Sequence, residues 1–123
     1  MVRFKKILCP VDFFKASTKA FAYTLKLAAN YGAKVHALHV VAPIIPATYG
    51  APFSVEDLTT DLEKEARGLL QKLQARADKQ HVQMSTEVRL GDIDREILRA
   101  VEKQKADLVV MGCLLYTSDA ADE

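Results

Sequence analysis

The chain has 123 residues, of which 50% are hydrophobic and 27% are charged, and its formal net charge is +1. This length fits one domain with one hydrophobic core, in the composition range of ordinary globular proteins. The near-neutral charge argues against a nucleic-acid binder that works by phosphate neutralisation, and it gives no reason to expect an anionic membrane surface as a partner.

The first part of the chain predicts a β-α-β unit. The apolar run over 7–11 is typical of a short strand that is covered on both faces. Ser17 can cap a helix that continues to about residue 30, and Gly32 can take the left-handed conformation that ends it. A second strand is predicted over 34–41, where apolar residues are dense. Because such crossovers are right-handed, the two strands should be parallel.

The remainder of the chain predicts a loop and then helices and strands in alternation. They are a Pro- and Gly-containing loop over 42–53, a helix with one apolar face over 54–78, a strand over 84–90, a helix over 93–104 and a strand over 107–112. Ser54 can cap the first of these helices, and either Asp92 or Asp94 can cap the second. The order of elements predicts a three-layer, doubly wound α/β fold with a parallel sheet.

Asp12 follows the first predicted strand directly, at the strand's carboxyl end. Ligands of open α/β sheets bind at this edge, so a carboxylate here is a candidate binding group. The alternative is that Asp12 only caps or orients the loop before the first helix. Position alone leaves both interpretations open.

Other residues with reactive side chains favour structural roles. His36 and His39 are three apart in a predicted strand, so they should lie on opposite faces and form no metal site. Cys9 should be a protonated, inert core residue, and with Cys113 far along the chain no disulfide framework is expected. Neither a transmembrane run nor a secretory signal is seen, so a cytoplasmic protein without membrane contacts is expected.

Enzyme motifs on related nucleotide folds are not found. Phe13, Phe14, Lys15 and Ala16 stand where a glycine-rich loop would follow the first strand, and no GxxxxGK[ST] segment occurs. We therefore expect no enzymatic activity and no catalytic residues. Slow hydrolytic activity is left open, although no base for it can be named.

Several segments together carry a family resemblance. They are ILCPVD at 7–12, Ser17, GAKVHALHV at 32–40, VRLGDIDREIL at 88–98 and ADLVVMG at 106–112. In this order and spacing the chain resembles the universal stress protein family over residues 2–112. The resemblance implies a Rossmann-like parallel sheet with strand order 3-2-1-4-5, of which this chain would hold four strands, in the order 3-2-1-4. Strands one and four would then flank the ligand crevice.

The resemblance also implies a binding site for ATP or another adenine nucleotide. In nucleotide-binding members an acid at the position of Asp12 contacts the adenosine, and backbone near Val40 and Val41 contacts adenine. Gly112 matches the first glycine of the motif G-x2-G-x9-G-[ST], whose backbone N–H groups close around the phosphates. On this basis the candidate nucleotide contacts are Pro10, Val11, Asp12, Phe13, Lys15, Val40, Val41, Met111 and Gly112.

Nothing after Gly112 matches that motif. Residues 113–123, CLLYTSDAADE, read instead as the translation of a transposon-type sequencing adapter. We expect a stress-protein domain over 1–112, incomplete at its C-terminal end, followed by a non-native tail over 113–123. Resequencing the locus tests this expectation.

Two functions remain open from the sequence. The first is a stress-response regulatory protein that binds an adenine nucleotide and forms a homodimer, as the family implies. The second is a stress protein that binds no nucleotide and acts through dimerisation and protein contacts. The phosphate-binding segment after the fourth strand separates the two types. In the turn after the first strand, the bulky Phe13 and Phe14 depart from the small residues that are common in the family.

Overall fold

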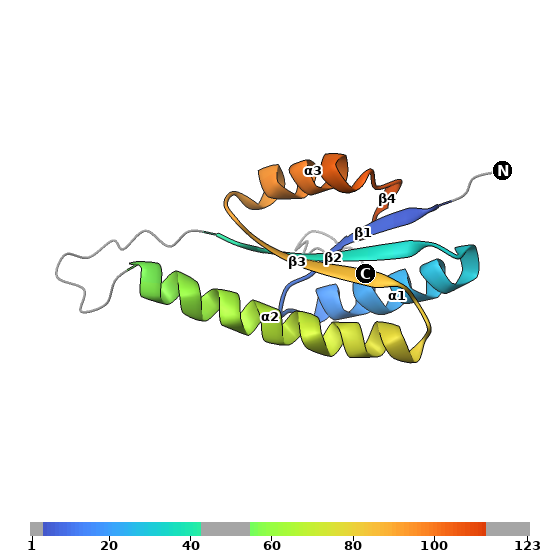
Figure 1. Ribbon diagram of the computed structural model, residues 1–123, viewed down its shortest axis with the longest axis horizontal. Coiled ribbons are helices and arrows are strands. Elements are labelled where there is room, and N and C mark those ends of the chain that lie inside the picture. The colour runs from blue at the N-terminus through green and yellow to red at the C-terminus, as the bar shows by residue number, and fades with distance from the viewer. Residues whose placement is uncertain (1–3, 43–54, 113–123) are drawn as a thin grey trace, which may run out of the picture.

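A computed structural model describes residues 4–42 and 55–112 (Figure 1). Within these residues helices and strands alternate along the chain, as β1 (Lys6–Pro10), α1 (Lys15–Tyr31), β2 (Lys34–Val41), α2 (Val55–Lys79), β3 (Met84–Leu90), α3 (Ile93–Gln104) and β4 (Leu108–Val109). Most of the predicted loop over 42–53, the predicted cap Ser54 and the predicted tail over 113–123 lie outside the described residues.

The four strands form one parallel sheet in the order β3-β2-β1-β4, which confirms the predicted order. Ile7 of β1 pairs with Val35 of β2 on one side and with Leu108 of β4 on the other. Because all strands run in the same direction, their carboxyl ends meet at one edge of the sheet. The ligand rule for α/β folds applies to that edge.

The helices form a layer on each face of the sheet. In Figure 1, α1 and α2 lie below the sheet and α3 lies above it. Alternation along the strands feeds both layers, since Ile7 and Cys9 face α1 and α2 whereas Leu8 faces α3. Phe21 and Leu25 of α1 are fully buried against the first face, and burial of such a side chain contributes about 1.5–3 kcal/mol.

The helix ends confirm two predictions and correct one. Gly32 ends α1 in the left-handed conformation (φ 67°), and Asp92 caps α3 by accepting a hydrogen bond from the Arg95 N–H at 3.1 Å. The prediction of Ser17 as the cap of α1 is wrong, because the helix begins at Lys15. The Asp12 carboxylate accepts the Phe14 N–H at 2.8 Å and turns the chain into the helix before Ser17 is reached.

The last strand is shorter than predicted. Only Leu108 and Val109 form the ladder with β1, whereas the apolar run predicted a strand over 107–112. Backbone hydrogen bonds continue one residue to each side, from the Asp107 N–H to the Lys6 carbonyl and from the Val110 N–H to the Leu8 carbonyl. Within the described residues β4 has one neighbour, β1.

Neither a membrane span nor a metal cluster is found over 4–42 and 55–112. No helix in these ranges is long and apolar enough to cross a membrane. The same ranges contain no group of three or more His, Cys, Asp or Glu side chains that could hold a metal ion.

Candidate functional site

A cavity of about 90 Å³ opens at the carboxyl edge of the sheet, where β1, β2 and β4 end. Its lining also includes the start of α3, which crosses above this edge. The residues that line it are Pro10, Val11, Asp12, Leu38, His39, Val40, Ile93, Ile97, Met111 and Gly112. The fold therefore brings Asp12 and Gly112, 100 positions apart in the chain, to one cavity.

Asp12 shapes the loop and also borders the cavity. Its Oδ1 accepts the Phe14 N–H at 2.8 Å, and its own N–H donates to the Ser17 hydroxyl at 2.8 Å. Asp12 therefore orients the loop before α1. A carboxylate has about four acceptor positions, so this loop contact still leaves acceptor capacity for a ligand.

Gly112 allows the chain after β4 to touch the first turn of α1. A Cβ atom at this position would lie 2.3 Å from the Ala16 carbonyl oxygen and 2.6 Å from the Ser17 backbone nitrogen. Real Cβ atoms do not approach backbone so closely, so a larger residue would push the two segments apart. The absence of a side chain at Gly112 therefore allows the end of β4 and the N-terminus of α1 to lie close together beside the cavity.

His39 is a site residue that the sequence did not reveal. Its Nδ1 lies 2.7 Å from the Val11 carbonyl oxygen, and because a carbonyl only accepts, Nδ1 must carry the proton. In the neutral ring Nε2 is then an acceptor. Phe13 packs edge-on against this ring, with centroids 5.4 Å apart, and so lies on His39 instead of filling the cavity.

The nine predicted contact residues divide between the cavity and its surroundings. Pro10, Val11, Asp12, Val40, Met111 and Gly112 line the cavity. Phe13 and Lys15 are exposed and Val41 is buried, and none of these three lines it. The sequence missed Leu38, His39, Ile93 and Ile97. A signal for His39 was its place next to Val40 at a strand end, whereas Ile93 and Ile97 depend on where α3 crosses the sheet.

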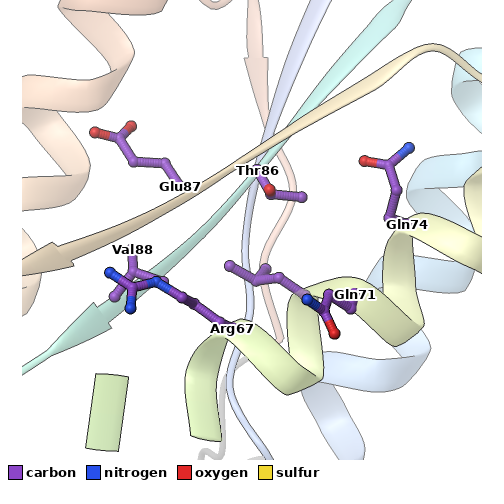
Figure 2. Close-up of a pocket in the computed structure, with 7 residues that line it drawn as sticks. Arg67, Gln71, Gln74, Thr86, Glu87 and Val88 are labelled. Atoms are coloured by element: carbon purple, nitrogen blue, oxygen red, sulfur yellow. The ribbon is translucent and has the colours of Figure 1, made fainter. Parts of the chain in front are cut away.

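A larger cavity, of about 320 Å³, lies between α2 and β3 (Figure 2). Figure 2 shows Arg67 and Gln74 extending from α2 toward β3, while the side chain of Glu87 points away from α2. Arg67 is mostly exposed and pairs with Glu63 of its own helix at 3.8 Å. This groove runs along an edge strand and not across the carboxyl ends of the strands, so we take the smaller cavity as the candidate site.

The smaller cavity, at about 90 Å³, has less volume than most binding pockets for small molecules. Pockets for small molecules usually measure about 300–1,000 Å³. The described residues therefore form the floor of a site that would hold part of a ligand, with an apolar wall from α3 and a carboxylate at one end.

The chain is similar to known stress proteins. It is 33% identical over 109 residues to a universal stress protein of Methanocaldococcus jannaschii, and this match covers 89% of the chain but 64% of that relative's length. A solved universal stress protein family structure from Burkholderia pseudomallei superposes with a TM-score of 0.79 at 24% identity, covering 89% of this chain and 81% of that one.

Two further solved structures of the same fold carry ligands. One is a universal stress protein in complex with cAMP, with a TM-score of 0.73, 16% identity and coverage of 99% of this chain and 87% of that one. The other is an Arabidopsis thaliana universal stress protein family protein with AMP bound, with a TM-score of 0.64, 20% identity and coverage of 86% and 76%.

The family model for universal stress proteins matches residues 3–113. This range contains all seven helices and strands of the described residues, and the order of the four strands is the one that the resemblance implied. The chain belongs to the universal stress protein family.

Proposed function

We propose that this chain binds an adenine nucleotide at the cavity on the carboxyl edge of the sheet and acts as a cytoplasmic stress-response regulator. One observation carries the proposal: Asp12, Val40 and Gly112, from three different strand ends, line the same cavity. The two stress proteins solved with cAMP and with AMP support an adenine nucleotide as the ligand.

The chemistry of the cavity fits the parts of such a ligand. The Asp12 carboxylate can accept hydrogen bonds from ribose hydroxyls, and Leu38, Ile93 and Ile97 offer apolar contact to a purine. The first turn of α1 contains no acidic residue and lies against Gly112. The positive end of the α1 dipole therefore favours phosphate on that side.

A second candidate is a stress protein that binds no nucleotide. It is favoured by the size of the cavity and by the use of Asp12 Oδ1 in the loop. In both candidates the protein would act as a homodimer through protein contacts. We propose no catalytic step in either, and phosphate release from ATP would measure any slow hydrolysis.

Equilibrium binding of AMP and ATP, followed by calorimetry, separates the two candidates. We expect a dissociation constant tighter than about 1 mM, which corresponds to about 4 kcal/mol of binding. The D12N variant keeps an oxygen for the Phe14 N–H but loses the charge, and it should bind at least about tenfold more weakly. D78N, which alters an exposed acid on α2, should bind as the unchanged chain does. Binding weaker than about 1 mM would favour the second candidate.

A further inference from the structure

A connected chain of polar side chains crosses the α3 side of the sheet, away from the nucleotide cavity. The Ser85 hydroxyl lies 2.6 Å from Nδ1 of His36, and Nε2 of His36 lies 2.9 Å from the Glu87 carboxylate. Arg89 then contacts Glu87 at 2.8 Å and Glu96 at 3.1 Å. A hydroxyl, an imidazole and a carboxylate in this order form the arrangement that activates serine nucleophiles.

The strand register produces this arrangement. His36 of β2 and Ser85 of β3 are direct partners in the parallel ladder, so their side chains lie next to each other on one face. His36 is 3% exposed, whereas Ser85 is exposed. The base is thus shielded from water while the hydroxyl is open to a reactant.

The carboxylate fixes the position of the proton on His36. Burial raises the pKa of Glu87, but the hydrogen bond from His36 and the charge of Arg89 outweigh burial and hold that pKa below its ordinary value. An ionised carboxylate only accepts, so Nε2 must donate to it. In the neutral ring Nδ1 is then an acceptor, and the Ser85 hydroxyl donates to it.

A cavity of about 200 Å³ adjoins Ser85. Lys6, Lys34 and Gln83 line it together with Ser85, and Lys6 and Lys34 are partners in the ladder between β1 and β2. Two lysines in the lining of a cavity that Ser85 also borders favour a reactant that carries negative charge.

We propose that Ser85 is a nucleophile that accepts the acyl group of a small acyl phosphate. The Ser85 oxygen bonds to the carbonyl carbon, and its proton passes to Nδ1 of His36. The bond between that carbon and the bridging oxygen breaks, and phosphate leaves with the electron pair. His36 gives the proton to the bridging oxygen as it leaves, so the products are an acyl ester on Ser85, neutral His36 and hydrogenphosphate.

Each neighbour has a role in this step. Lys6 and Lys34 line the adjoining cavity and favour binding of the doubly negative phosphate group. Glu87 is a positioning residue that holds the imidazole and stabilises its charged form, while Arg89, Glu96 and Arg99 hold Glu87 in turn. The proposal does not depend on nucleotide binding, because none of these residues lines the nucleotide cavity.

Incubation of the full chain with acetyl phosphate, followed by peptide mass spectrometry, tests the proposal. Alkaline hydroxylamine distinguishes the expected serine ester, which it cleaves, from acetyl-lysine, which it does not. The double variant S85A/T86S is the matched control, since it removes the hydroxyl at position 85 and places a serine at the adjacent position on β3, which lines the cavity beside α2. H36Q removes the base, and E87Q removes the charge that stabilises it.

We expect one hydroxylamine-sensitive acetyl group on Ser85, with a rate that falls by about 10²–10⁴-fold in H36Q. The S85A/T86S variant should carry no ester. In E87Q the rate should fall, whereas E87D, which keeps a carboxylate for Nε2 of His36, should react faster than E87Q. A residue with only a packing role would show no such rescue. Acetylation of lysines alone, phosphorylation of Ser85, or an equal rate in H36Q would overturn the proposal.

Discussion

Gly112 shows how one residue sets the geometry of the candidate site. Its lack of a side chain lets the end of β4 lie against Ala16 and Ser17, so that the strand end, α1 and Asp12 all border one cavity. The sequence singled out Gly112 through a glycine motif, but the close approach to α1 could not be predicted, because it depends on how the crossover places β4 beside β1.

The G112A variant should be less stable than the unchanged chain by about 1–3 kcal/mol, because its methyl group would overlap the Ala16 carbonyl. Urea unfolding followed by circular dichroism measures the difference. G68A is the matched control, since nothing lies within 4 Å of a Cβ there. Gly68 is in α2, so that change should stabilise the chain by about 0.5–1 kcal/mol. Equal stability of G112A and the unchanged chain would contradict the close contact.

Cys9 should be inert in the folded chain, as the sequence predicted. Burial raises the pKa of its thiol from 9.0 to about 11, and the weaker effect of the hydrogen bond from Thr24 opposes this. In a C113S background, a thiol reagent at pH 8 should react only at the rate of unfolding, and rapidly in urea. Because the unfolded thiol ionises first, Cys9 should also lower the folding stability as pH rises from about 9 to about 11. Rapid reaction of the folded chain would contradict this burial.

At the scale of elements, α3 is fixed to the sheet by charge as well as by apolar contact. Ile97 and Ala100 pack on Leu8 and Leu38. Beside them, the buried Glu96 carboxylate accepts a hydrogen bond from the guanidinium of Arg89 on β3. Periodicity predicted α3 and β3 over the ranges that the structure has. The link between them was not predictable, since alternation shows which side chains share a face but not which of them form ion pairs.

Within the sheet, the pairing of Glu87 with His36 and Arg89 should make the stability of the fold depend on pH. The folded pKa of Glu87 is lowered, so its contribution is present above the ordinary value of 4.5 and is lost as pH falls through the lower folded value. The unchanged chain should therefore exceed E87Q in unfolding free energy at pH 7, and this difference should shrink below about pH 4.5. E102Q, at an exposed site on α3, is the control and should show little pH-dependent difference. A difference between the chain and E87Q that is constant from pH 3 to 7 would contradict the ion pair.

For the whole molecule, the sequence predicted more of the fold than of the site. The alternation of elements and right-handed crossovers predicted a parallel α/β sheet, and the family resemblance supplied the strand order. The site combines residues from three strand ends with Ile93 and Ile97 of α3. Asp12 was found by position, and Val40 and Gly112 were found through the resemblance, whereas Leu38 and His39 of β2 were missed. Ile93 and Ile97 were missed because they enter the site only through the crossing of a helix over the sheet.

Backbone amide NMR shifts during a titration with AMP test the central claim most directly. We expect saturable changes at Asp12, His39, Val40 and Gly112, and no comparable change at Gln71 and Gln74 in the groove between α2 and β3. The D12N variant should shift the same amides with a weaker dissociation constant. Changes that cluster in the α2–β3 groove, or no saturable change up to about 1 mM AMP, would contradict nucleotide binding at the carboxyl edge of the sheet.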